Sequence, residues 1–210
     1  MKSKHKALIL SMCAVLLVAV PVLGILAYLT DEDVVTNTFT FGSVSITLDE
    51  KDVDEDSNDT DNVTVNGVVR DKANSYKLMP GHLYIKDPII HVDSTSEDCF
   101  LFVKVVDEIA AMEDADTVAT QMANKGWIEV AGVDNVYVYT TDNVNPASVT
   151  AGSNVAVFDN FKIKGSVTNT ELAECANKTI TVTAYAVQKD GFEGKTAAEI
   201  WNTALGTQNP

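Results

Sequence analysis

The chain after residue 28 is predicted to be mostly strands, and several segments alternate between apolar and polar side chains with a period of two, which is typical of half-buried strands. The clearest case is the segment 179–187, where the two kinds of side chain fall on opposite faces of a strand. One face carries Ile180, Val182, Ala184 and Ala186, and the other carries Thr181, Thr183 and Tyr185.

Other segments add to this pattern without repeating it. Residues 100–106 are almost continuously apolar, which predicts a strand buried on both faces. Further strands are predicted at 63–70, 82–92, 127–130, 133–141 and 155–163. Many short strands separated by turn signals predict a mainly β fold, namely an antiparallel β-sandwich.

A few short helices are expected between these strands. Residues 107–125 have apolar side chains at helical spacing, and Gly126 ends that helical region. Near the C-terminus, Thr196 and Glu199 have the spacing of a capping box, which predicts a short helix that ends at Gly206.

The segment 34–48 is rich in Val, Thr, Phe and Ile, but its alternation changes phase. Phe39 and Phe41 lie on one parity, whereas the apolar residues after Gly42 lie on the other. Such a phase change requires a bulge or a break, which glycine tolerates. The segment is therefore either one bulged strand in one sheet or two half-strands whose apolar faces contact different partners.

An acidic segment at 49–61 lacks apolar periodicity and is predicted to be a loop. Asp52, Asp54 and Asp56 have the spacing of the first half of a calcium loop, which offers hard oxygen ligands. The glycine of the sharp turn is missing, and Val63 occupies the position of the bidentate glutamate. A solvated loop is favoured, with weak calcium binding as the alternative.

The first thirty residues resemble an export signal. Three lysines precede an apolar run over residues 7–26, and the small residue Ala27 comes just before a polar segment. This order predicts a signal peptide, residues 1–27, cleaved between Ala27 and Tyr28, and a single domain over 28–210. The apolar run is also long enough for an uncleaved membrane anchor, which is the alternative.

The net charge of −15 restricts the possible partners. Removal of residues 1–27 takes away three lysines and no acidic residue, so the charge falls to −18. A surface this acidic repels nucleic acid and anionic lipid, and it makes self-association sensitive to salt. Nucleic-acid binding is excluded.

Two cysteines, Cys99 and Cys175, remain after cleavage. In an exported chain they could form a disulfide that closes a long loop. Because Cys99 precedes an apolar strand, two buried thiols are an equally good interpretation.

No residue pattern predicts catalysis. The chain has no His-Glu-x-x-His motif for zinc and no Gly-x-Ser-x-Gly elbow for a nucleophile. His82 and His91 are nine residues apart, an odd separation that puts them on opposite faces of a regular strand. We therefore predict no enzyme activity and no cofactor.

Residues 24–31, followed by Val-Thr-Asn-Thr-Phe-Thr-Phe-Gly-Ser-Val at 35–44, resemble the start of the camelysin/TasA family. Looser matches lie at residues 79–81 with 86–88, and at 184–192 running into 200–201, whereas 107–154 match no pattern we can name. Members of this family are exported by Gram-positive bacteria and processed by a dedicated ER-type signal peptidase.

The resemblance implies a jelly-roll-like sandwich and a secreted subunit that forms biofilm-matrix fibres by donating an N-terminal strand. A strand at a free terminus is easily exchanged between copies, and head-to-tail donation does not close. We therefore expect a homopolymer in the extracellular matrix or at the cell surface, with the signal peptidase and other matrix proteins as further partners. The self-assembly residues are predicted to be Val35, Phe39, Phe41 and Gly42.

Two other functions remain open. Some relatives are described as metallopeptidases, so a camelysin-like cell-surface metallopeptidase is one alternative. A monomeric surface binding module, with Tyr137 and Tyr139 or the acidic loop as its contact surface, is the other.

Overall fold

The computed structural model describes residues 42–58 and 70–206, which belong to one compact unit, Gly42–Pro210. The predicted signal peptide, its cleavage site at Ala27 and Tyr28, and the segment 28–41 with Val35, Phe39 and Phe41 lie outside the described residues. Within the described part, no helix is long and apolar enough to cross a membrane.

The described residues form eleven strands and a few short helical segments. The strands are β1 Ile46–Lys51, β2 Arg70–Asp71, β3 Leu83–Ile85, β4 Ile89–Val92, β5 Cys99–Asp107, β6 Trp127–Glu129, β7 Val136–Tyr139, β8 Ser148–Val149, β9 Asn154–Ala156, β10 Asn160–Lys162 and β11 Ile180–Gln188. The helical segments are η1 Ala110–Met112, α2 Val118–Asn124, α3 Asn169–Ala173, α4 Ala197–Ile200 and the π-helical turn η2 Trp201–Leu205.

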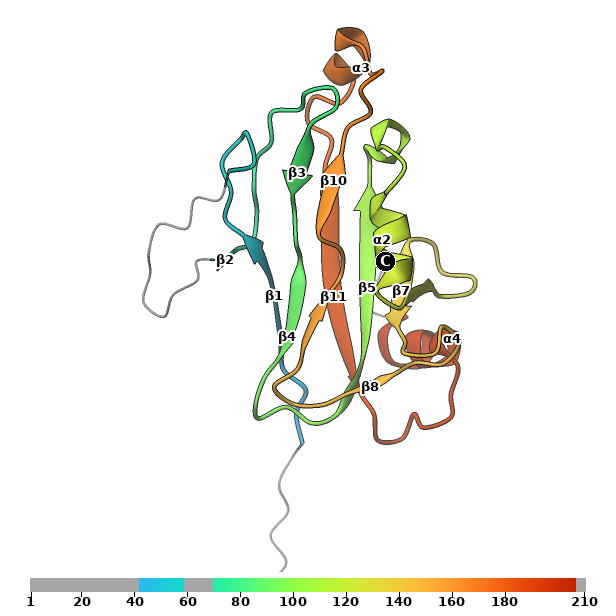
Figure 1. The fold of residues 1–210 in the computed structure, drawn as a ribbon. Helices are drawn as coiled ribbons and strands as arrows, with labels where there is room; N and C mark the ends of the chain where they lie inside the picture. The colour runs from blue at the N-terminus through green and yellow to red at the C-terminus, as the bar shows by residue number, and fades with distance from the viewer. Residues whose placement is uncertain (1–41, 59–69, 207–210) are drawn as a thin grey trace, which may run out of the picture. The chain divides into compact units, whose positions relative to one another are not determined.

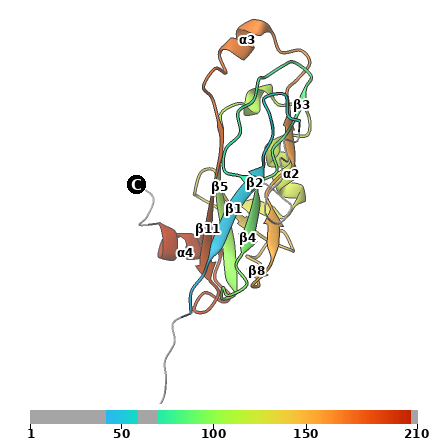
Figure 2. The same ribbon diagram turned by 90° about the vertical axis from the view of Figure 1, so that its left-hand side faces the viewer.

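The strands pair only antiparallel, in two main sheets (Figures 1 and 2). One sheet has the order β2-β1-β4-β9, and the other has the order β11-β5-β7-β6 with β8 also paired to β5. Strands β3 and β10 form a separate pair. The mainly β, sandwich-like fold predicted from the alternation is therefore confirmed.

Strand β5 is central to the protein because both of its faces are buried, as predicted. Leu101 and Val103 belong to the hydrophobic cluster that also contains Ile90 of β4. Phe102 belongs to a second cluster, on the other face of the sheet, that contains Trp201. Strand β11 alternates in the same way, since its even-numbered side chains pack against the first cluster.

The predicted helices are also present. The helical region at 107–125 is η1 followed by α2, and Gly126 has a φ of 88° at its end. A side chain at Gly126 would collide with the carbonyl oxygen of Thr140. The capping box of Thr196 and Glu199 begins α4.

Three predictions are corrected by the structure. The acidic loop does not begin at residue 49, because β1 continues to Lys51. The single strands predicted at 82–92 and 155–163 are each two short strands, the first interrupted before Pro88, whose nitrogen has no hydrogen to donate. Helix α3 was not predicted, although Thr168 and Glu171 form the same capping box as in α4.

Candidate functional site

A groove of about 910 Å³ lies between β1 and β11; β11 is the edge strand of its sheet, whereas β1 lies between β2 and β4. Its walls are Ile46–Glu50 with residues 72–76 and Leu78 on one side and residues 172 and 175–184 on the other, and Ile109 and Phe161 also line it.

Both apolar and polar residues line the groove. Eight of its apolar side chains are half-buried and pack against the first hydrophobic cluster. They are Ile46, Leu48, Tyr76, Leu78, Leu172, Ile180, Val182 and Ala184. Burial raises the pKa of Tyr76, whose hydroxyl donates a hydrogen bond to the carbonyl of Ile85 at 2.9 Å.

Strand β11 presents an open edge to this groove. It pairs antiparallel with β5 over its whole length, and beyond both ends the carbonyl of Thr179 and the amide of Lys189 continue that pairing. Because bonded residues alternate along an antiparallel strand, the odd-numbered residues of β11 bond to β5. The N–H and C=O groups of even-numbered residues such as Val182 therefore point away from β5, and no described strand pairs with them.

Strand β1 presents a shorter open edge. It pairs with β4 from Ile46 to Asp49, whereas β2 meets only Glu50 and Lys51 on its other side. The carbonyl of Ser45 accepts from the amide of Asp93, so the backbone groups of Ile46 and Leu48 face away from β4. On that side no described strand pairs with them.

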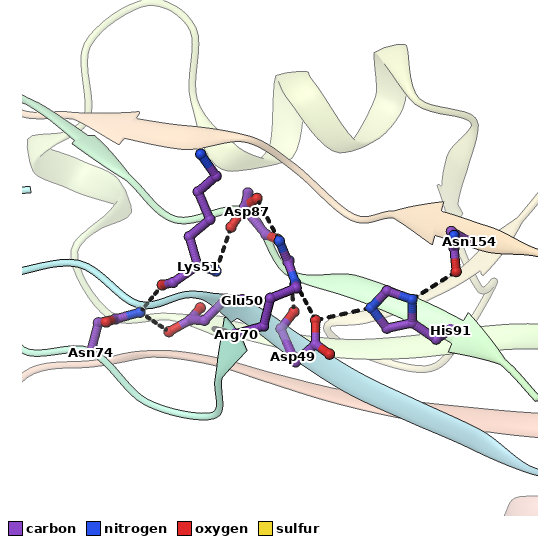
Figure 3. Close-up of polar contacts among 8 residues, drawn as sticks. All are labelled: Asp49, Glu50, Lys51, Arg70, Asn74, Asp87, His91 and Asn154. Carbon is purple, nitrogen blue, oxygen red and sulfur yellow. Dashed lines mark hydrogen bonds and ion pairs between the residues drawn. The ribbon is translucent and has the colours of Figure 1, made fainter. Parts of the chain in front are cut away.

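An ion-pair network determines where the open edge of β1 ends (Figure 3). The guanidinium of Arg70 contacts the carboxylate of Asp49 and lies 3.2 Å from that of Asp87. Asp87 also accepts from the backbone amide of Lys51 at 2.7 Å. His91 contacts Asp49 at 3.0 Å. These contacts fix β2 beside the last residues of β1.

Asn74 extends this covered part of β1. Its amide group donates to the carboxylate of Glu50 at 2.9 Å and to the carbonyl of Lys51 at 2.7 Å (Figure 3). Its oxygen accepts from the amide of Val53. The carboxylate of Glu50 is held from its other oxygen by Lys86 at 2.6 Å. This wall of the groove is thus rigidly bonded, whereas no described strand pairs with the outer backbone edge of residues 46–48.

A buried acid lies behind the groove. Glu113 is 3% exposed, and its Oε2 accepts from the amide of Val118 at 2.9 Å. Its Oε1 has no hydrogen-bond partner among the described residues. Burial, together with a smaller contribution from the negative charge of Asp107, raises the pKa of Glu113 to about 7. Asp107 in turn accepts from the amide of Ile109, whose side chain lines the groove.

The predicted calcium ligands do not form a site. Asp54 turns its carboxylate to its own loop and accepts from the amides of Asp56 at 3.0 Å and Asn58 at 2.7 Å. Among the described residues, no group of three or more acidic, histidine or cysteine side chains could hold a metal ion.

The disulfide between Cys99 and Cys175 is not formed, so the alternative of two buried thiols is the correct one. The sulfur of Cys175 lies 3.1 Å from that of Met112, and Cys175 lines the groove. Burial raises the pKa of Cys99 to about 11, which keeps that thiol protonated and unreactive.

The histidines and tyrosines considered in the sequence analysis do not form a common site. His82 contacts the carbonyl of Asp56 and His91 contacts Asp49 and Asn154, so the two histidines have separate partners. Tyr137 and Tyr139, the contact surface of the alternative binding module, are both half-buried. Tyr139 packs on Trp127 at 5.4 Å between ring centroids.

Gly42 is the one predicted self-assembly residue that the structure describes. It is exposed at the start of the compact unit, beside the side chain of Glu97. The groove residues themselves were not predicted, because their grouping depends on contacts between segments more than a hundred residues apart. The only local signal was the clean alternation of segment 179–187.

No family model, no curated protein and no solved structure matches this chain, so the likeness to the camelysin/TasA family depends on the sequence motifs.

Proposed function

We propose that this protein is a secreted structural subunit that assembles into extracellular biofilm-matrix fibres by strand donation. The donor is the N-terminal segment 28–41, and the acceptor is the groove between β1 and β11 of a neighbouring copy. The observation that carries this proposal is a pair of strand edges, of β1 at residues 46–48 and of β11, that no described strand pairs with and that lie on the two sides of one groove with half-buried apolar side chains.

An open edge is best covered by a strand. A helix or a loop can bury apolar side chains, but only an extended segment can also bond the unpaired N–H and C=O groups in sequence. The half-buried side chains of Ile180 and Val182 then become fully buried in the same step, which adds hydrophobic stabilisation to the main-chain bonds.

The segment 28–41 has the pattern that such a groove requires. Val35, Phe39 and Phe41 fall on odd positions, while even positions 36, 38 and 40 are threonine. As a strand it would present large apolar side chains to the groove and threonines to solvent. Fully extended, its fourteen residues span about 45 Å, against about 20 Å for the groove wall of residues 179–184, which leaves enough chain to connect two subunits.

Donation to a neighbour in the same orientation is heterologous, so it does not close on itself and it produces a fibre. This agrees with the resemblance to the fibre-forming family. The high negative charge makes growth dependent on salt, because charged neighbours must be screened.

The test compares chain 28–210 with chain 42–210, which retains the compact unit, by negative-stain electron microscopy and sedimentation with and without added salt. We expect fibres from the longer chain and a folded monomer from the shorter one. Fibres from chain 42–210 would contradict the proposal.

Matched variants separate the groove-facing residues from the rest of the segment. The double substitution Phe39→Ala with Phe41→Ala should abolish fibres, whereas Thr38→Ala with Thr40→Ala should leave them largely intact. A synthetic peptide of residues 28–41, added to the mature chain, should shorten fibres by filling free grooves. Equal effects of the two double substitutions would refute the role of the odd-numbered face.

A further inference from the structure

Residues 42–45 leave the sandwich in a fixed direction. They continue the line of β1 and are held alongside residues 93–97. The carbonyl of Ser43 accepts from the amide of Glu97 at 3.0 Å, and that of Ser45 accepts from the amide of Asp93 at 3.0 Å. The amide of Ser45 donates to the hydroxyl of Ser96 at 3.2 Å. The chain therefore makes no turn within these residues.

This exit lies at the opposite end of the sandwich from α3. Strand β1 begins at the end where β4 and β5 are connected and runs toward α3, and β11 runs back from α3 (Figures 1 and 2). The groove reaches the α3 end, because Leu172 and Cys175 line it just before β11 begins.

The exit at residues 42–45 and the α3 end of the groove favour donation to a neighbour. Residues 43 and 45 are bonded to residues 97 and 93, so the segment could lie antiparallel beside β1 of its own chain only after a reversal before residue 43. To enter its own groove from the α3 end, it would have to travel back along β1, a distance of about 20 Å. A neighbour placed in line, with its α3 end next to the exit, removes both obstacles.

We infer that the donated strand enters the neighbour's groove at the α3 end and runs parallel to β1 and antiparallel to β11. This inference rests on the proposed function and specifies the partner of the groove, namely a second copy in the same orientation. It also assigns a role to the contacts of residues 43–45 with residues 93–97, which fix the end of the compact unit from which the donated segment begins.

The antiparallel pairing predicts which side chains become neighbours. Residues directly opposite each other in an antiparallel pair share a face. Phe39 and Phe41 therefore lie inward with Ile180 and Val182, at the α3 end of the groove. On the outer face, donor threonines at even positions lie beside the exposed threonines of β11 and the residue before it. The donor set is Thr36, Thr38 and Thr40, and the acceptor set is Thr179, Thr181 and Thr183.

These two sets allow a direct test of strand direction. Three variants each carry one donor threonine changed to cysteine, and three others each carry one acceptor threonine changed to cysteine. The nine donor–acceptor pairs are mixed and then oxidised after fibres have formed. Disulfide-linked dimers are then measured on non-reducing gels. As the donor cysteine moves from residue 40 to 36, we expect the strongest cross-link to move from residue 179 toward 183. This direction of movement does not depend on the exact register.

Controls and outcomes separate this inference from the proposed function. As a control, each donor variant is mixed with the unsubstituted chain. A disulfide-linked dimer in this mixture would show that the donor cysteine links to Cys99 or Cys175. The same scan with a cysteine-bearing 28–41 peptide and chain 42–210 gives a second measurement that does not require fibre formation. A cross-link maximum that moves the opposite way, or fibres without links to β11, would overturn the inferred direction and leave fibre formation standing. A mature chain that forms no fibres would overturn the proposed function and this inference with it.

Discussion

The two sides of the β11–β5–β7–β6 sheet are covered in different ways. On its outer face, α4 and η2 of the same chain bury Ile200, Trp201 and Leu205 against Phe102 and Val138. On its inner face the β1–β4 sheet covers β5, but it leaves the edge of β11 open along the groove.

The difference shows which parts of a sheet can be completed by the chain itself. A sheet face requires only apolar contact, so a short helix is sufficient to cover it. A sheet edge requires hydrogen bonds in register, which only another strand supplies. The chain covers its outer face with its C-terminal helix, and we propose that a neighbouring copy completes the edge.

The largest expected effect is on the covered side. Trp201 is 3% exposed, with its ring 5.6 Å from that of Phe102 and 5.2 Å from that of Tyr185. Trp201→Ala should therefore lower the free energy of unfolding of chain 42–210 by about 3–5 kcal/mol, measured by urea denaturation. Val144→Ala is the control, because that side chain is 69% exposed, and it should change stability by less than about 0.5 kcal/mol. A small effect of Trp201→Ala would mean that the helix does not complete the fold.

The buried acid behind the groove gives the next effect. The pKa of Glu113 is raised from the ordinary 4.5 of a glutamate to about 7 in the folded state, so the folded protein binds more protons than the unfolded chain between these values. Stability should therefore fall as pH rises from about 4.5 to 7, by on the order of 3 kcal/mol at most. Glu113→Gln should remove this decrease, measured by urea denaturation at several pH values.

Glu108→Gln is the matched control for that pH series. The amide and hydroxyl of Thr179 lower the pKa of the exposed Glu108, so its stabilising contribution is present above the unfolded pKa and is lost as pH falls. The Glu108→Gln variant should keep the decrease in stability above pH 4.5. If the Glu113→Gln variant also keeps the decrease in stability above pH 4.5, a group other than Glu113 causes that decrease.

The smallest effect on stability is expected in the groove. Val182 is half-buried, whereas Val138 on the covered side of the sheet is 0% exposed. Val182→Ala should cost the monomer less than about 1 kcal/mol, and Val138→Ala about 2 kcal/mol. Fibre formation should be more sensitive to Val182→Ala than to Val138→Ala, so Val182→Ala should raise the concentration needed for assembly. Equal effects of the two substitutions on both measurements would remove the distinction between the covered and open sides.

Local sequence signals predicted much of the fold but little of the candidate site. The continuous apolar run at 100–106 identified a strand buried on both faces, and Thr196 with Glu199 identified the start of α4. The same capping signal at Thr168 and Glu171 would have identified α3. The predicted roles of Val35, Phe39 and Phe41 stay predictions, because these residues lie outside the described part of the chain.

The sequence by itself therefore determined where most strands lie, the two buried faces of β5 and the helix start at Thr196, because each depends on side chains only two to four residues apart. Tertiary structure alone decided that β1 and β11 lie across a groove from each other, that Arg70 joins Asp49 to Asp87, and that Cys99 and Cys175 remain thiols. Those features depend on distances between remote segments, which are fixed by how the two sheets pack and leave no periodic trace in the chain.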